Sequence, residues 1–139
     1  METLMRTLSL IAALYLLAVP AFAGGDATKG ADDFKKCKAC HSIIAPDGTA
    51  IQKGGKTGPN LFGVTGRPVA SVADFKYGTS ITAVGAKGVI WDEVMVTNYV
   101  TDPTAWLKEQ TGDASAVTKM TFKIATGGED IAAYLASIK

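Results

Sequence analysis

The pentapeptide Cys37-Lys38-Ala39-Cys40-His41 constrains this chain most, because it contains both cysteines and the only histidine. A Cys-x-x-Cys-His run is the sequence at which c-type haem is attached to a polypeptide. Two thiols three positions apart lie on one helical turn, where both can bond to the vinyl groups of one porphyrin. The next residue, an imidazole, can then reach the iron. In a domain this small, such a group would form a large part of the core.

The first 23 residues have the pattern of a secretory signal peptide. Arg6 precedes an apolar run at 8–19, and the Ala-Phe-Ala sequence at 21–23 is a small-x-small cleavage site. The run, about 12 residues long, is shorter than the roughly 20 residues that span a bilayer, which disfavours an uncleaved membrane anchor. We predict cleavage after Ala23, export to the periplasm, and one mature domain at 24–139.

The charge balance limits the partners. The formal net charge is +1, so there is no global basic field of the kind that nucleic-acid binding requires. We therefore predict no nucleic-acid partner, and any docking guided by charge must come from a local asymmetry.

The residue pattern of the mature chain predicts an all-α domain of four or five helices with long loops. Asp26 starts a helix that reaches the cysteines, short helical turns follow at 71–75 and 79–86, and a helix occupies 91–100. Asp102-Pro103 restarts a helix that runs to about 110, and a last helix begins near 129. The stretches 42–69 and 111–127 read as loops, and no strand pairing is predicted. A loop as long as 42–69 is unusual unless it wraps around something.

Three other interpretations of the cysteine motif exist. A thioredoxin-like redox pair belongs near a βαβ pattern, which this sequence lacks. A zinc site needs four ligands, and an acidic residue would have to complete the set. A plain disulfide would leave His41 as a surface residue. Export favours haem, because haem is attached covalently outside the cytoplasm.

The residue pattern alone does not identify the second axial ligand of the iron. A single histidine excludes bis-histidine ligation within the chain, which leaves Met95, Met120, a lysine or an open position. Met95 lies on the apolar face of the predicted helix 91–100, where methionine usually fills core space. Met120 lies in an irregular polar stretch and has no helical face to fill, so we favour Met120.

At this level of detail the mature chain resembles the class I cytochromes c, and most closely the bacterial cytochrome c2 group. The resemblance covers 24–139 and depends on landmarks that occur in the right order. These are Cys37-x-x-Cys40-His41, Thr57-Gly58-Pro59-Asn60-Leu61, Gly66-Arg67, Trp91-Asp92, Asp102-Pro103, Thr118-Lys119-Met120 and Ala133-Tyr134-Leu135. The implied fold is the small cytochrome c fold, with helices and long loops wrapped around one covalent haem c and its iron.

The resemblance also implies how the haem is held. Cys37 and Cys40 would form the thioether bonds, and His41 Nε2 and the Met120 sulfur would be the axial ligands of the iron. The carbonyl of Pro59 would accept a hydrogen bond from the other ring nitrogen of His41, which orients the ring and raises its basicity.

Further residues would contact the haem or its methionine ligand. Arg67, Tyr77 and Trp91 match groups that bind a buried haem propionate, an anion that needs donors. Tyr99 matches a tyrosine whose hydroxyl contacts the methionine sulfur, and Thr118 joins the cofactor-binding set from the same landmark as Met120.

The resemblance implies an electron-transfer protein and not an enzyme. The expected role is that of a monomeric periplasmic shuttle, which carries one electron from the cytochrome bc1 complex to a photosynthetic reaction centre or a terminal oxidase. Docking at these membrane complexes would be transient and guided by lysines near the haem edge. These are Lys35, Lys36, Lys38, Lys56, Lys119 and Lys123.

Two rival functions remain. An open sixth iron position would indicate a peroxidase or a gas-binding sensor. Free thiols at Cys37 and Cys40 would indicate a thiol-disulfide oxidoreductase.

Overall fold

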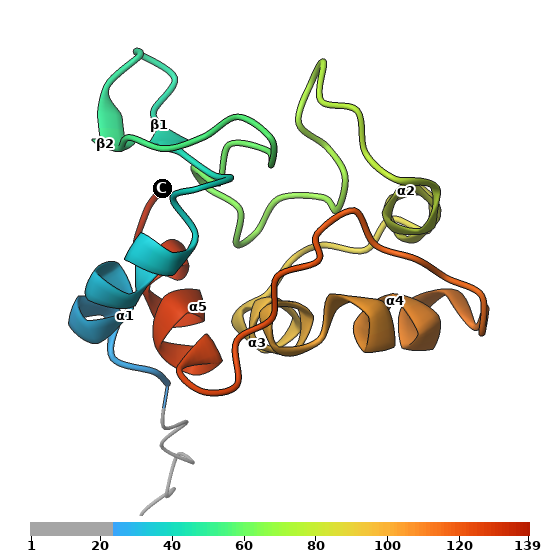
Figure 1. Cartoon of the computed structure of the whole chain (residues 1–139). Helices are drawn as coiled ribbons and strands as arrows, with labels where there is room; N and C mark the ends of the chain where they lie inside the picture. Colours follow the sequence, from blue (N-terminus) through green and yellow to red (C-terminus); the bar gives the residue numbers. More distant parts are fainter. Residues whose placement is uncertain (1–23) are drawn as a thin grey trace, which may run out of the picture.

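Five α-helices joined by long loops make up most of the part of the chain that the structure describes (Figure 1). The structure is a computed structural model that describes residues 24–139, so the predicted signal peptide at 1–23 lies outside it. The elements are α1 (Ala27–Asp33), the 3-10 turn η1 (Phe34–Lys36), β1 (Ile43–Ile44), β2 (Ala50–Gln52), α2 (Thr79–Ala86), α3 (Glu93–Thr101), α4 (Pro103–Thr111) and α5 (Gly128–Ala136). This order confirms the predicted all-α class. Within 24–139, no helix combines the length and apolar character needed to cross a membrane.

The helix starts follow from local capping. Asp26, Asp92 and Asp102 precede α1, α3 and α4, and each carboxylate accepts hydrogen bonds from backbone N–H groups of the first turn. These bonds satisfy donors that have no partner inside the helix. Pro103 occupies the first turn of α4, and Gly112 ends that helix with a φ of 70° in the left-handed region.

The prediction that the chain has no strand pairing was wrong. β1 and β2 form a short antiparallel pair in which Ile43 lies opposite Gln52, with an irregularity in the register next to Ile43. The tight turn between them is closed by a bond from the Ala45 N–H to the Thr49 carbonyl (2.9 Å). Strands of two and three residues are too short to produce a visible alternation in the sequence.

The predicted helical turn at 71–75 was also wrong. This segment is an irregular loop; Asp74 within it has a φ of 62°, and Ala70 directly before it has a φ of 55°. A left-handed residue interrupts a right-handed helix, and such a conformation is set by the surroundings of the loop. The prediction for 79–86 was confirmed, since α2 covers those residues.

The two terminal helices, α1 and α5, pack against each other at one end of the molecule (Figure 1). Gly30 allows this close approach, because a Cβ there would overlap the carbonyl group of Asp130. Phe34, which is fully buried, meets the Tyr134 ring edge to face at 5.8 Å. This packing anchors the segment that leads directly into the cysteine motif.

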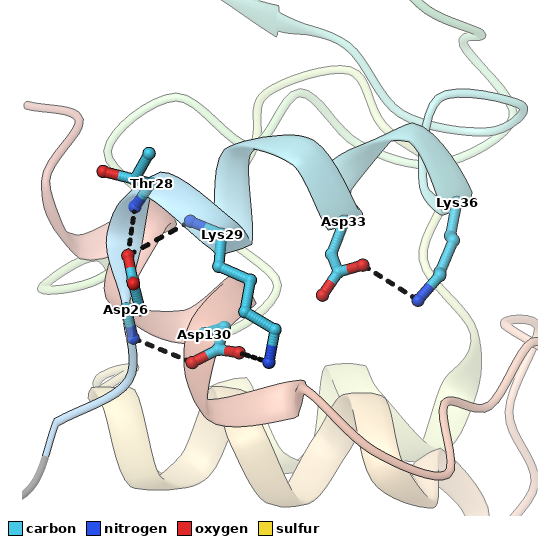
Figure 2. A network of polar contacts seen from close by, with 6 residues as sticks. All are labelled: Asp26, Thr28, Lys29, Asp33, Lys36 and Asp130. Carbon is cyan, nitrogen blue, oxygen red and sulfur yellow. Dashed lines mark hydrogen bonds and ion pairs between the residues drawn. The ribbon is translucent and has the colours of Figure 1, made fainter.

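A polar network reinforces the same contact (Figure 2). The Asp130 carboxylate accepts a hydrogen bond from the Asp26 N–H at 2.8 Å. It also forms an ion pair with Lys29 Nζ at 2.7 Å. The hydrogen bond and ion pair from Lys29 hold the pKa of Asp130 below its usual range. The start of α1 is thereby fixed to the first turn of α5.

Candidate functional site

A cavity of about 460 Å³ lies between the cysteine motif and the loop that precedes α5. Its volume falls within the range of small-molecule and cofactor sites. All ten residues of the predicted site line this one cavity, although they extend along the sequence from 37 to 120. They are Cys37, Cys40, His41, Pro59, Arg67, Tyr77, Trp91, Tyr99, Thr118 and Met120.

His41 forms one wall of the cavity. Its Nδ1 lies 2.8 Å from the Pro59 carbonyl oxygen, and because a carbonyl only accepts, Nδ1 carries the proton and donates. The Nε2 atom is then the unprotonated nitrogen, the form that binds metals. Burial lowers the pKa of His41, which favours this neutral ring.

The backbone of Gly58 packs directly on the His41 ring. A Cβ at Gly58 would lie 2.6 Å from Nδ1 and 2.7 Å from Nε2, well inside van der Waals contact. Nothing in the sequence singled out Gly58, although it belongs to the Thr57–Leu61 landmark. Only a residue without a side chain allows the ring to take this position.

The two cysteines lie where the helical segment ends. Cys37 is partly buried, Cys40 is exposed, and the two are not joined to each other. Burial raises the pKa of the Cys37 thiol to about 11. Cysteines that act as redox nucleophiles have lowered pKa values, so this environment disfavours the thiol-disulfide oxidoreductase. Within 24–139, no three His, Cys, Asp or Glu side chains cluster closely enough to hold a metal ion, as the zinc interpretation would need.

Met120 lines the cavity from the loop before α5, whereas Met95 packs against the hydrophobic core. The hydroxyl of Thr118 fixes the backbone of Met120 at both ends. It accepts a bond from the Met120 N–H at 2.9 Å and donates to the Met120 carbonyl at 3.2 Å. The methionine predicted from its irregular context is therefore the one that the fold brings to the cavity.

Arg67 brings a half-buried cation to the cavity. Its two terminal nitrogens donate to the Phe62 carbonyl (2.9 Å) and the Asn60 carbonyl (3.1 Å), while its buried Nε has no partner. Burial lowers the pKa of the guanidinium. A buried donor without a partner is costly, and an anion such as a haem propionate would satisfy it.

Tyr77 offers a second donor at the cavity. Its oxygen accepts a bond from the Val72 N–H at 3.1 Å, and its own O–H proton is available for another acceptor. Tyr77 and Arg67 together suit the anionic edge of a haem.

Three aromatic rings form a compact group beside the cavity. Trp91 stacks on Trp106 at 4.9 Å, and Tyr99 meets both rings edge to face at 5.3 and 5.4 Å. Burial raises the pKa of Tyr99, so its hydroxyl is a neutral donor. This packing joins α3 to α4 and orients two of the predicted site residues, Trp91 and Tyr99.

Much of the remaining lining is apolar, and most of it was not predicted. It comes partly from loops and partly from the inner faces of α2, α3 and α4. It includes Leu61, Val64, Ala70, Ile81, Val96 and Leu107. An apolar cavity with a histidine, a methionine, two adjacent thiols and an unpaired buried guanidinium N–H fits a covalently attached haem.

Proteins of known sequence and structure that resemble this chain agree with a haem-binding cavity. No family model matches the chain. The cytochrome c2 of Rhodobacter capsulatus is 59% identical over 132 residues, which is 95% of each chain. A cytochrome c-550 of Paracoccus versutus is 57% identical over 123 residues, 86% of this chain and 80% of the relative. The solved structure of Rhodobacter capsulatus cytochrome c2 has a TM-score of 0.80 and 60% identity, and the match covers 81% of this chain and 97% of that chain.

The fold and the cavity define a class I cytochrome c, a small all-helical electron-transfer protein. More specifically, the chain belongs to the cytochrome c2 family, as its sequence resemblance predicted. Proteins of this family carry one covalently attached haem c with its iron, and they are electron carriers and not enzymes.

Proposed function

We propose that this protein is a periplasmic single-haem shuttle whose iron is bound by His41 and Met120. The observation that carries the proposal is that these two side chains line the same cavity, next to Cys37 and Cys40. The two thiols would form the thioether bonds, and the imidazole and the thioether would occupy the two axial positions. With both positions filled by the protein, no site remains for a substrate.

The haem would supply one-electron exchange, and the protein would orient the iron ligands and set the reduction potential. The bond from His41 Nδ1 to Pro59 fixes the ring orientation and leaves Nε2 free for the iron. The sulfur of Met120 is a soft ligand that favours the reduced state and raises the reduction potential.

The propionate and the methionine sulfur would each have their own donors. Arg67, Tyr77 and Trp91 would compensate a buried propionate, and the unpaired Nε of Arg67 supports this. Tyr99 would contact the Met120 sulfur, and Thr118 would shape the turn that presents it.

The docking surface for redox partners would surround the mouth of the cavity. Lys36, Lys76 and Lys119 line the cavity, and the apolar side chains of Val117 and Phe122 are exposed beside them. Such a surface suits weak, transient complexes that are guided by charge and contain apolar contacts at the centre.

Ion pairs with acidic residues reduce the net positive charge of the lysines that were predicted to lie near the haem edge. Lys35 pairs with Asp32 at 3.7 Å, Lys36 with Asp33 at 3.0 Å, and Lys123 with Asp102 at 2.7 Å. The three remaining predicted lysines, Lys38, Lys56 and Lys119, should therefore contribute more to charge guidance than the three paired ones.

Export through a signal peptide at 1–23 would deliver the domain at 24–139 to the periplasm as a monomer. There it would receive an electron from the cytochrome bc1 complex and pass it to a photosynthetic reaction centre or a terminal oxidase.

Rates of electron transfer with purified bc1 complex, reaction centre and oxidase, measured side by side by stopped flow, test this function. The holoprotein is expected to be reduced by the first and oxidised by at least one of the others, and both rates should fall as salt rises. A holoprotein that exchanges electrons with none of the three would refute the shuttle role. Tight binding of carbon monoxide by the reduced protein would favour a sensor with an open iron position.

A further inference from the structure

Residues 117–124, here called the ligand segment, carry Met120 and contain no helix or strand. Burial holds only the end of this segment, where Ile124 is 5% exposed; Val117 and Phe122, on either side of Met120, are 63% and 44% exposed. Polar contacts to other parts of the fold hold the rest of the segment. They run from Val117 N to Ser80 Oγ (3.0 Å), Lys119 Nζ to the Lys76 carbonyl (3.0 Å), Lys123 Nζ to Asp102 Oδ2 (2.7 Å) and Ile124 N to the Val100 carbonyl (3.0 Å).

We propose that the Asp102–Lys123 ion pair is a clamp that keeps Met120 in its iron-binding position. Asp102 and Lys123 are then positioning residues, which act on the iron only through Met120. The inference rests on the proposed role of Met120 as a ligand.

Asp102 gives the clamp a rigid anchor. It is the residue at which α3 ends and α4 begins, and its N–H donates to the Asn98 carbonyl at 3.1 Å. One carboxylate oxygen caps α4 by accepting from the Ala105 N–H at 2.9 Å, and the other binds Lys123. A single side chain thus connects the α3–α4 junction to the ligand segment, three residues beyond Met120.

The size of the effect follows from the exposure of the pair. The Lys123 and Asp102 side chains are 54% and 40% exposed, so solvent and salt screen their attraction. An exposed ion pair of this kind changes the equilibrium constant between two conformations by about two- to fivefold. If the clamp biases the ligand segment towards its closed state, its loss should raise the population with Met120 detached by that factor.

Imidazole binding to the oxidised holoprotein measures this population, because imidazole reaches the iron only when Met120 leaves. Lys123→Gln and Asp102→Asn each break the ion pair, and asparagine retains the oxygen that caps α4. Both variants are expected to bind imidazole about two- to fivefold more tightly at low salt, and the gain should disappear at high salt. Lys123→Arg should behave like wild type, and the double variant should show no more than the effect of one single variant.

Lys29→Gln is the matched control. It removes the same charge and breaks another 2.7 Å ion pair, that of Lys29 with Asp130 between α1 and α5. It should leave the imidazole affinity unchanged. An equal gain in Lys29→Gln would mean that lost charge or general destabilisation is responsible, which would overturn the clamp.

Met120→Ala separates a failure of the clamp from a failure of the ligand assignment. If Met120→Ala binds imidazole no better than wild type, Met120 is not the ligand, and the proposed function fails with it. If Met120→Ala binds much more tightly while Lys123→Gln and Asp102→Asn match wild type, the ligand assignment stands and the clamp is wrong.

Discussion

Replacing Gly58 by alanine is expected to destabilise the holoprotein, because the new methyl group would enter the space of the His41 ring. The added Cβ would lie 2.6 Å from Nδ1 and closer still to Cε1, whereas ordinary contacts begin at 3.4 Å, so ring and backbone would have to separate by at least 3.4 − 2.6 = 0.8 Å. Overpacking of this kind costs about 1–3 kcal/mol. The separation would also strain the 2.8 Å bond from Nδ1 to Pro59, whose loss adds about 1 kcal/mol.

Denaturant unfolding of the holoprotein, followed by absorbance of the haem, measures this loss as a change in the free energy of unfolding. Gly58→Ala should lose about 2–4 kcal/mol. Gly78→Ser is the control, because its Cβ would meet the Lys119 side chain at an ordinary 3.4 Å and serine is a good cap for α2. The control should remain within about 0.5 kcal/mol of wild type. A Gly58→Ala protein that unfolds at the wild-type denaturant concentration would refute the packing of this backbone on the imidazole.

Three further predictions concern the α1–α5 contact and the half-buried Arg67. Phe34→Ala should cost about 3–5 kcal/mol in the same unfolding experiment, because the ring is fully buried against Tyr134; a loss below about 1 kcal/mol would contradict this. Asp130 has a lowered pKa, so its contribution is present above the ordinary carboxyl pKa and is lost as the pH falls through the lowered value. Asp130→Asn should therefore weaken the loss of stability at acid pH, and an unchanged pH profile would show that the contact with Lys29 contributes nothing. Arg67→Gln should lower the reduction potential in a redox titration, because a cation near the iron disfavours the ferric state; an unchanged midpoint would argue against its proposed site.

The helices were predictable because their signals are local. Asp26 and the Asp102-Pro103 pair indicated the starts of α1 and α4, and the capping carboxylates lie within three residues of the N–H groups they bind. Short elements stabilised by distant contacts were not predictable. The β1–β2 pair and the loop at 71–75 have no period of their own, and their conformation depends on the surrounding fold.

The candidate site was predictable to a large extent, but for a different reason. The order of short motifs indicated the family, and the fold then brought those motifs to one cavity. Contacts formed only in three dimensions were missed. The contact of Lys123 with Asp102 is one example, because nothing in the sequence around Lys123 indicates its partner. The contact of Gly58 with the imidazole ring is another, although its neighbour Pro59 was expected to bond to the same ring.

The central claim, that Met120 and not Met95 binds the iron opposite His41, has a direct test in the reduced holoprotein. Both residues lie in the predicted mature domain, where no other methionine occurs. With methionine methyl groups labelled with carbon-13, a methyl group held above the porphyrin should resonate far upfield of the other, because of the ring current. The account predicts that this signal disappears in Met120→Leu and persists in Met95→Leu. A shifted signal that survives in Met120→Leu, or the absence of any shifted signal in the wild-type protein, would contradict it.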